Sequence, residues 1–568
     1  MTNYQFTGGT ICAPATIPGT GAISIIRVSG NEALAIADKV IDTKGVPIAE
    51  TEGYRLRYGT VFEADGSVLD NVIVSVFRAP HSYTGEDSVE ISCHASRFIV
   101  NKILELLVSA GARIAAPGEF TRRAFVNGKM DLAQAEAVAD VIASQSAASH
   151  RVAMNQLKGG FSSELKVLRE KLLTMTSLLE LELDFSEEDV EFASRKELGQ
   201  LVDDSLTHIG RLTASFSRGN AIKNGVPVAI VGATNTGKST LLNALLGEER
   251  AIVSDIAGTT RDTIEETLNI DGILFRFIDT AGIRETDETI EKIGIDRTFK
   301  KLGEAAVVLG MTDLSRGEAA VLEDADFILS KVNEMGGVKN VGTENDGAET
   351  GGSHLAGTDG TSLAETGGAS LVETSGASLA ETDGTSRSET SGASQHGHGD
   401  GQERKVVILV NKCDVAGDFY RDDNGTGYGS GNDLGENMAE IGDNKNVNRD
   451  NNIVSLIENK YDNCKVIPIS AKTGKGLSTL TKTLGEIGSE ITGSTDETLV
   501  TNVRHYEALV RAASALERVR AGLHIATLPP DLIAQDLREA LYHLGEIVGE
   551  ITTDETLGNI FRNFCIGK

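Results

Sequence analysis

Apolar residues recur every three or four positions through Phe125–Phe216, a spacing that places them on one face of a helix. The runs LAQAEAVADVIASQ and LKVLREKLLTMTSLLELELDF keep this spacing over many turns. Leu499–Lys568 shows the same pattern near the other end of the chain. We therefore expect two helical segments, 121–222 and 491–568, that complete one bundle around an inserted domain.

Two further stretches show strand patterns. Short apolar runs such as Ala22–Val28 and Leu69–Phe77 alternate with Gly and Pro turns, which predicts a mixed α/β domain over residues 1–120. From Val226 to Ile487, apolar strands alternate with helices, as is typical of a doubly wound parallel sheet. The predicted fold class is therefore α/β plus α.

Two segments within 223–490 lack such patterns. The first, about 333–403, contains an eight-residue repeat that begins TDGTSLAE at Thr358. One leucine per repeat cannot bury enough apolar surface to offset the entropy of ordering, so a low-complexity insert is favoured over a short-period β-solenoid. The second, about 415–463, is rich in Gly, Asn and Asp and is interpreted as a loop with one apolar patch near Ile453–Ile457.

The composition narrows the classes of function. Of the 568 residues, 53 are Lys or Arg and 83 are Asp or Glu, and the net charge of −30 argues against nucleic-acid binding over the whole surface. About half of this excess lies in the two inserts. No window approaches the roughly eighteen apolar residues of a membrane helix, and no signal-peptide pattern opens the sequence. The five cysteines lie far apart, so we expect a cytoplasmic protein.

One motif predicts a phosphate-binding loop. The strand PVAIVG leads into Gly232-Ala-Thr-Asn-Thr-Gly237-Lys238-Ser239, and the amphipathic run TLLNALLG follows. The pattern G-x-x-x-x-G-K-S between a strand and a helix surrounds phosphates with backbone N–H groups. Lys238 would reach the β and γ oxygens, and Ser239 would ligate Mg²⁺.

Three further motifs indicate a GTPase rather than an ATPase. KVVILV ends in Asn411-Lys412-Cys413-Asp414, where the Asp414 carboxylate can accept from guanine N1–H and its amine, groups that adenine does not match. CKVIPIS leads to Ser470-Ala471-Lys472, which resembles the loop behind guanine in small GTPases. In FRFIDTAG, Asp279 can hold Mg²⁺ through water and Gly282 can offer its N–H to the γ-phosphate.

The residue that follows Gly282 cannot orient the attacking water. Ile283 occupies the position of the glutamine in Ras-like proteins. Another group must assist hydrolysis, and the acidic segment from Arg284 to Glu291 can supply one.

Longer runs carry a resemblance to a known family. These runs are PATIPGTGAISIIRVSG, PHSYTGEDSVEISCHAS, PGEFTRRAFVNGKMDLAQAEAVAD, SDIAGTTRD, DTAGIRE and the terminal FCIGK. On them the chain resembles the tRNA modification GTPases of the MnmE (TrmE) type over nearly everything outside the two inserts. The resemblance implies an N-terminal folate-binding domain (1–120), a helical domain in two parts (121–222 and 491–568) and an inserted Ras-like P-loop G domain (223–490).

The resemblance also implies a reaction and its partners. Together with a flavoprotein, MnmG (GidA), the family adds an aminomethyl or carboxymethylaminomethyl group to C5 of the wobble uridine (U34) of certain tRNAs. Its members are activated by K⁺-dependent pairing of two G domains, which implies a homodimer. The implied cofactors are 5-formyl-tetrahydrofolate or a related folate, Mg²⁺ and K⁺, and GTP is the substrate.

Carried over by position, the resemblance assigns individual residues. Glu291 would orient the hydrolytic water through a solvent molecule, and Lys238 is the second catalytic residue. K⁺ would be held by Asn235, Ser254, Ile256 and Thr259, and Mg²⁺ by Ser239 and Thr260. The residues expected to bind GTP are Asn235, Thr236, Gly237, Lys238, Ser239, Thr240, Ser254, Asp255, Ile256, Ala257, Gly258, Thr259, Thr260, Asp279, Thr280, Ala281, Gly282, Asn411, Lys412, Asp414, Ser470, Ala471 and Lys472.

The sequence departs from the family pattern at two places. Ser254 replaces the usual threonine but keeps the oxygen, and Ala233-Thr234 replaces the usual Arg-Pro in the phosphate loop. The residues that bind phosphate are retained.

For the folate, the resemblance assigns Arg27, Glu86, Lys129 and Lys568. An arginine and lysines suit the carboxylates of a formyl-tetrahydrofolate, and a glutamate suits the amine edge of its pterin. The terminal lysine makes Cys565 a poor prenylation site, and we expect burial of this cysteine rather than thiol chemistry.

Two other functions stay open on the residues alone. A ribosome-assembly or RNA-binding GTPase would carry a basic terminal domain, whereas both flanks here are mixed or acidic and helical. A folate-dependent methyl-group enzyme with an accessory GTPase is the alternative for the first 120 residues.

Overall fold

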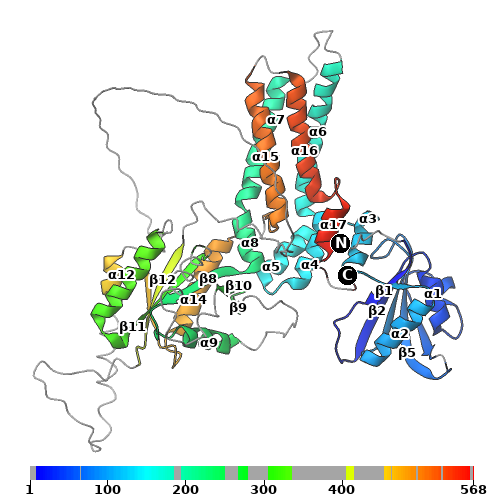
Figure 1. Cartoon of the computed structure of the whole chain (residues 1–568), viewed down its shortest axis with the longest axis horizontal. Coiled ribbons are helices and arrows are strands. Elements are labelled where there is room, and N and C mark those ends of the chain that lie inside the picture. The colour runs from blue at the N-terminus through cyan, green and yellow to red at the C-terminus, as the bar shows by residue number, and fades with distance from the viewer. Residues whose placement is uncertain are drawn as a thin grey trace, which may run out of the picture.

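The computed structural model describes residues 8–63, 65–184, 194–249, 266–278, 303, 305–334, 404–414, 453–461, 464–493, 497–525, 529–562, 564 and 567. They form an N-terminal domain (8–114), a helical domain (119–224 and 497–562) and a central domain (226–493). In Figure 1 the helical domain lies between the two domains that contain sheets. Within the described part of the chain, no helix is both long and apolar enough to cross a membrane.

The N-terminal domain is a seven-stranded sheet in the order β3-β4-β5-β6-β2-β1-β7. Its elements are β1 (Ile11–Pro14), β2 (Ile23–Ser29), α1 (Ala33–Val40), β3 (Ile41–Asp42), η1 (Ile48–Glu50), β4 (Arg55–Phe62), β5 (Val68–Phe77), β6 (Ser88–His94), α2 (Arg97–Ser109) and β7 (Arg113–Ile114). Neighbouring strands are antiparallel except β1 and β7, which are parallel.

One face of this sheet is covered by α1 and α2. In β5, Val72, Val74 and Val76 are buried in the core beneath α1 and α2, whereas Ile73 is exposed on the other face. This alternation follows from the two-residue period of a strand. β2 and β5 confirm the strands predicted at Ala22–Val28 and Leu69–Phe77.

The helical domain confirms the predicted helical segments within the described residues. Its helices are α3 (Glu119–Val126), α4 (Leu132–Ala143), α5 (Ala147–Leu157), α6 (Gly160–Asp184), α7 (Arg195–Ala214), α8 (Phe216–Asn224), α15 (Val503–Leu523), α16 (Pro530–Val548) and α17 (Asp554–Arg562). Reciprocal capping boxes fix the starts of α4 and α5: Asp131 accepts from the N–H of Gln134, and Ser146 accepts from that of Ser149.

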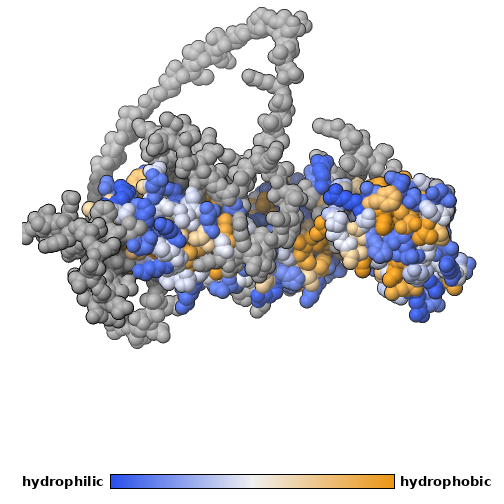
Figure 2. All heavy atoms as spheres, turned by 90° about the horizontal axis from the view of Figure 1, so that it is seen from below, coloured by the Kyte–Doolittle hydropathy of each residue, from blue (hydrophilic) through white to orange (hydrophobic). Residues whose placement is uncertain are grey.

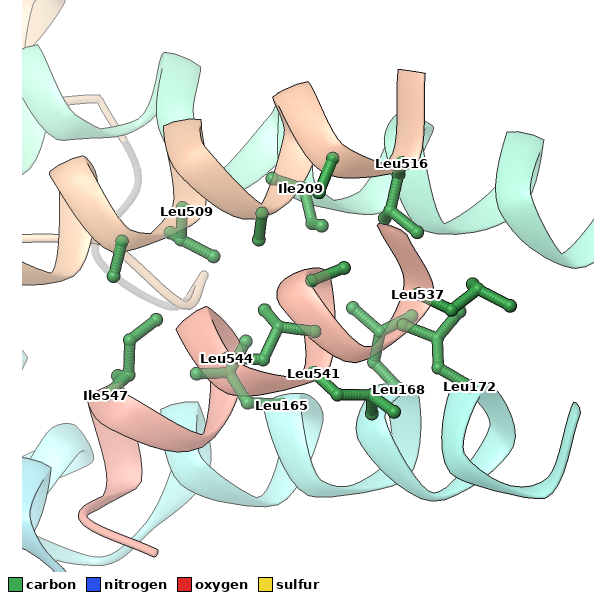
Figure 3. Close-up of a cluster of buried hydrophobic side chains, with 14 of the residues drawn as sticks. Leu165, Leu168, Leu172, Ile209, Leu509, Leu516, Leu537, Leu541, Leu544 and Ile547 are labelled. Carbon is green, nitrogen blue, oxygen red and sulfur yellow. The ribbon is translucent and has the colours of Figure 1, made fainter. Parts of the chain in front are cut away.

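One hydrophobic core joins the two parts of the helical domain. Leu165 and Leu172 of α6 pack with Leu516 of α15 and with Leu537 and Leu544 of α16 (Figure 3). Helices on either side of the central domain in sequence therefore share one interior.

A buried ion cluster adds to this junction. Glu136 of α4 accepts from Nε and Nη2 of Arg504 at 2.9 and 3.1 Å, and Nε2 of His505 lies 2.6 Å from the same carboxylate. Arg504 also donates to the carbonyls of Glu546 and Ile547 at the end of α16. Burial alone would raise the pKa of Glu136, but His505 and Arg504 outweigh it and lower the pKa to about 2.

The central domain is a six-stranded sheet in the order β13-β12-β11-β8-β10-β9, parallel except for the edge strand β9. Its elements are β8 (Val226–Gly232), α9 (Lys238–Glu249), β9 (Glu266–Ile270), β10 (Ile273–Ile278), β11 (Val307–Asp313), η3 (Leu314–Arg316), α12 (Glu318–Glu334), β12 (Lys405–Asn411), β13 (Lys465–Pro468) and α14 (Leu477–Thr492). Hydrophobic cores cover both faces, which explains why β11 and β12 are buried along their whole length.

The interpretation of 415–463 as a loop is wrong over its last part. Residues 453–460 form a helix. Ile453 and Ile457, only 1 % and 0 % exposed, pack in the core beside Val466. An apolar pair at i and i+4 forms the inner face of this helix, a signal too short to separate it from the polar residues before it.

Candidate nucleotide and folate sites

The carboxyl ends of parallel strands bring three nucleotide motifs to one edge of the central sheet. β8 ends at Gly232, β12 at Asn411 and β13 at Pro468. β11 lies between β8 and β12. Ligands of open parallel sheets bind outside this edge, where the loops that follow the strands converge.

Two glycines let the phosphate loop pass close to its neighbours. Gly232 and Gly237 have φ values of +155° and +98°. A Cβ on Gly232 would lie 2.3 Å from the carbonyl oxygen of Met311, and one on Gly237 would lie 2.4 Å from Nδ2 of Asn411. Any side chain at either position would displace the loop from β11 or β12.

Lys238 opens α9 and folds back over the loop. Its Nζ donates to the carbonyl oxygens of Gly232 at 2.9 Å and Ala233 at 2.8 Å. Burial lowers the pKa of this ammonium. A negatively charged ligand would therefore stabilise the protonated lysine, because phosphate oxygens would supply the negative charge that the protein around the ammonium lacks.

Asn411 joins all three motifs through one buried side chain. Its Nδ2 donates to the carbonyl oxygen of Thr236 in the phosphate loop at 2.7 Å. Its Oδ1 accepts from the N–H of Ala471 at 3.0 Å. The amide thus sets the distance from the phosphate loop to the loop that starts at Ser470.

The remaining predicted base-binding residues surround this bridge. Lys412 pairs with Asp313 at 2.6 Å, and Asp414 is exposed two residues later. Ser470 is buried and its Oγ accepts from the N–H of Thr473, while Lys472 is exposed. The exposed side chains of Asp414 and Lys472 are therefore accessible to a ligand.

Several predicted site residues lie outside the described residues. They are Ser254, Asp255, Ile256, Ala257, Gly258, Thr259, Thr260, Asp279, Thr280, Ala281, Gly282, Ile283, Glu291, Cys565 and Lys568.

Of the predicted metal ligands, Asn235 and Ser239 are described. Asn235 is exposed with φ +63°, and both side chains offer oxygen, the donor that Mg²⁺ and K⁺ prefer. Among the described residues, no cluster of three His, Cys, Asp or Glu side chains could hold a metal.

In the N-terminal domain, Arg27 lies on the sheet face opposite α1 and α2, where Phe120 of α3 also packs. Its Nε and Nη2 donate to Glu90 of β6 at 3.0 and 2.8 Å. The guanidinium lies 5.0 Å from the ring centre of Tyr83 and 5.7 Å from that of Phe120. Its Nη1 is buried without a hydrogen-bond partner among the described residues, so this arginine has a donor to offer an anionic or carbonyl ligand.

Glu86 lies near Arg27 and is already bound by protein groups. It accepts from Ser29 at 2.8 Å and from Nη1 of Arg123 at 3.0 and 3.1 Å. Lys129 reaches the same loop, where it donates to the carbonyl of Pro80 at 2.9 Å. The structure therefore gathers Arg27, Glu86 and Lys129 around residues 80–86.

Sequence reasoning missed the charged residues that support these groups. Arg123 of α3 also binds Glu119 at 3.0 Å and the carbonyl of Gly9 at 2.8 Å. Burial would raise the pKa of Glu119, but hydrogen bonds from Arg113, Ala116 and Arg123 lower it overall. Asp313, the partner of Lys412, was also missed, although an aspartate at the end of a buried strand is a readable signal.

Two family models together match most of the chain. Residues 10–129 match a model described as the GTP-binding protein TrmE N-terminus. Residues 132–565 match a model described as the MnmE helical domain. The second range spans the central domain, between the two parts of the helical domain.

Curated relatives match over nearly their full length. A tRNA modification GTPase MnmE from Parabacteroides distasonis is 44 % identical over 562 residues, which cover 98 % of this chain and 100 % of that protein. Proteins of the same name from Porphyromonas gingivalis and Flavobacterium johnsoniae are each 42 % identical, over 100 % and 98 % of this chain and 99 % of those proteins. A GTP-binding protein of Sulfolobus solfataricus bound to GDP is 14 % identical over 58 % of this chain and 67 % of its own, with a TM-score of 0.24.

Proposed function

The chain belongs to the MnmE (TrmE) family of tRNA modification GTPases, and on this premise we propose that it is a K⁺-dependent GTPase that modifies the wobble uridine. It is a GTP hydrolase that acts in tRNA modification. The bridge that Asn411 makes between Thr236 and Ala471 carries the proposal for the site, because it joins the phosphate and base loops. We further propose that the central domain is a Ras-like G domain inserted into the helical domain.

In the proposed GTP site, this chain's residues bind and orient the nucleotide. Lys238 exchanges its bonds to Gly232 and Ala233 for bonds to the β and γ oxygens. Asp414 accepts from the guanine edge, and the loop at Ser470–Lys472 backs the base. Mg²⁺, held by Ser239 and Thr260, would neutralise charge that develops on the phosphates.

Hydrolysis is proposed to depend on K⁺ and a glutamate. Asn235, Ser254, Ile256 and Thr259 would hold K⁺, which supplies the positive charge that an arginine finger supplies elsewhere. Glu291 would orient the water, since Ile283 cannot.

The N-terminal domain is proposed to bind a folate. The buried, unpartnered Nη1 of Arg27 fits a carbonyl or carboxylate oxygen of such a ligand. Lys129 and Lys568 would add charge for its carboxylates, and Glu86 would accept from the pterin amine. Since Arg123 and Ser29 already bind Glu86, the pterin would share this carboxylate rather than displace them.

A homodimer is proposed through the face of the N-terminal sheet that lies opposite α1 and α2. Tyr54, Leu56 and Tyr58 are 70, 66 and 66 % exposed there, and Tyr58 lies opposite exposed Ile73 on β5. Figure 2 shows hydrophobic residues gathered over the N-terminal domain, at the right of the view. An exposed apolar face of this kind commonly marks an interaction surface.

Wobble-uridine analysis tests the proposed reaction. In a strain that lacks this gene, U34 of the affected tRNAs should lose the aminomethyl or carboxymethylaminomethyl group and regain it when the chain and a flavoprotein MnmG (GidA) are supplied. Lys238→Ala should fail to restore it, because GTP cannot be held. Normal wobble uridine in the deletion strain, with a defect in ribosome assembly instead, would favour the RNA-binding alternative.

A further inference from the structure

Asp313 lies beside the base-reading motif although 99 residues separate the two in sequence. It is the last residue of β11, and its register partner in the parallel strand β12 is Asn411. The two strands therefore end side by side. Asp313 thus faces the first turn of the loop that runs from Asn411 to Asp414.

Both carboxylate oxygens of Asp313 are occupied. Oδ2 accepts from Nζ of Lys412 at 2.6 Å, and Oδ1 accepts from the N–H and Oγ of Ser315 at 3.0 and 2.6 Å. Only 5 % of the residue is exposed. Burial would raise its pKa, but the bonds from Lys412 and Ser315 lower it, so the carboxylate stays ionised at neutral pH.

Lys412 needs such an anchor because its backbone is unusual. Its φ is +64°, in the left-handed region that a lysine rarely adopts. The preceding residue, Asn411, is fixed at both ends of its side chain. The bond to Asp313 fixes Lys412 as well. With both residues fixed, the direction in which the backbone continues to Asp414 is also fixed.

We infer that Asp313 is a positioning residue for guanine, acting through Lys412 to set the place of Asp414. The inference rests on the proposed guanine site and deepens it. Asp313 binds Lys412 and Ser315 and is not among the residues assigned to the phosphates or the attacking water. Its loss should therefore weaken base binding and leave the chemical step unchanged. The effect should be largest for the nucleotide that makes the most bonds to Asp414.

The experiment compares GDP with IDP, which lacks the exocyclic amine. In the full-length protein, Asp313→Asn should raise the Kd of GDP about tenfold, as expected for one lost charge-assisted hydrogen bond. The Kd of IDP should rise less, so the preference for GDP over IDP falls. At saturating GTP and K⁺, kcat should stay within about twofold of the wild type, since only ground-state binding is lost.

Two further variants make the test specific. Asp326→Asn removes a Lys–Asp pair with Lys460 (2.7 and 2.8 Å) on the exposed side of α12 in the same domain, and should change neither Kd. If Asp313 acts through Lys412, Asp313→Asn should add nothing to Lys412→Met in the double variant. Additive effects, or an unchanged GDP-to-IDP ratio in Asp313→Asn, would overturn the inference.

The experiment also recognises a variant that does not fold and an error in the proposed guanine site. If Asp313→Asn does not fold, Ser315→Ala takes its place, because it removes only the 2.6 Å bond from an exposed hydroxyl. This variant should shift the ratio in the same direction by a smaller factor, and an unchanged ratio would overturn the inference. A wild-type protein that binds ADP as tightly as GDP would instead overturn the guanine site itself.

Discussion

Asn411 shows how a single buried amide can hold a binding site together. Its donor faces Thr236 and its acceptor faces Ala471. An aspartate could not replace it, because a carboxylate has no donor for the carbonyl of Thr236. Loss of the side chain would leave a buried donor and a buried acceptor unpaired, at about 1–3 kcal/mol each.

A substitution at Glu291 should change the rate of GTP hydrolysis without changing the affinity for GTP. We expect Glu291→Ala to lower kcat about 10²- to 10³-fold with nearly unchanged GTP affinity, because one water-orienting group is lost. Single-turnover hydrolysis and nucleotide titration measure the two quantities, with Asp287→Ala in the same acidic segment as the control. A raised KM with normal kcat would make Glu291 a binding or structural residue.

Glu136 should make stability depend on pH in the acidic range. Its pKa is about 2 in the folded protein, against 4.5 as the ordinary value. Below pH 4.5 the unfolded chain takes up a proton that the folded chain does not. The cluster's contribution, on the order of 3 kcal/mol, is therefore complete above that pH and lost as pH falls toward 2.

Denaturant unfolding of Glu136→Gln measures this contribution. The variant should be less stable than the wild type at pH 6, and the gap in unfolding free energy should shrink by pH 3.5. Because all other carboxylates are common to both proteins, the difference isolates Glu136. An equal gap at both pH values would contradict the assigned pKa.

At the scale of elements, the helix at 453–460 divides the second insert into two unlike parts. Its inner face carries Ile453 and Ile457, which pack with Val466 beneath the sheet. The residues from 415 to 452 lie outside the described part of the chain. The two parts should therefore respond differently to deletion.

Paired deletions test this difference. A short Gly/Ser linker in place of 416–451 should preserve stability and GTP affinity, because loop length costs little entropy. A linker in place of 416–461 should destabilise the protein by about 4 kcal/mol or more, since two buried isoleucines are lost. Thermal unfolding compares them, and equal stability would show that the helix is dispensable.

The repeats should also be dispensable for hydrolysis. They leave the sheet between α12 and β12, and no residue assigned to phosphate, metal or base lies among them. A linker in place of 340–400 should preserve folding, GTP affinity and K⁺-stimulated turnover, because a doubling of loop length costs only about 0.6 kcal/mol. Loss of hydrolysis in the purified, folded variant would show that the repeats take part in the reaction.

At the scale of the whole molecule, hydrolysis should respond to the cation and to protein concentration. We expect K⁺ to stimulate turnover and Na⁺ to do so poorly at equal ionic strength, because a smaller ion fits badly among fixed oxygens. If two copies must pair, turnover per chain should rise with concentration.

Asn235→Ala serves as the matched variant for this response. It should lose most of the K⁺ stimulation, so that its rates in K⁺ and Na⁺ become nearly equal. Steady-state phosphate release in KCl and NaCl measures both. Equal rates in the two salts for the wild-type protein would refute the proposed K⁺ dependence.

Much of the molecule could be predicted from the sequence, because the signals are local. One stretch of 24 residues contains the strand Val226–Gly232, the glycines of the phosphate loop and the helix that begins at Lys238. The strand, the backbone angles of the glycines and the start of the helix each depend on residues close by in the sequence. The long apolar periodicity of α6 likewise specifies a helix by itself. The helix at 453–460 escaped because two apolar positions are too few to establish a period.

Only the tertiary structure decided which distant residues meet. Asn411 and Thr236, Lys412 and Asp313, and Glu136 and Arg504 are 175, 99 and 368 residues apart. Strand order places the first two pairs together, and the shared core of α6, α15 and α16 supports the third. Such pairings depend on how whole elements pack, and no residue's neighbours in sequence carry that information.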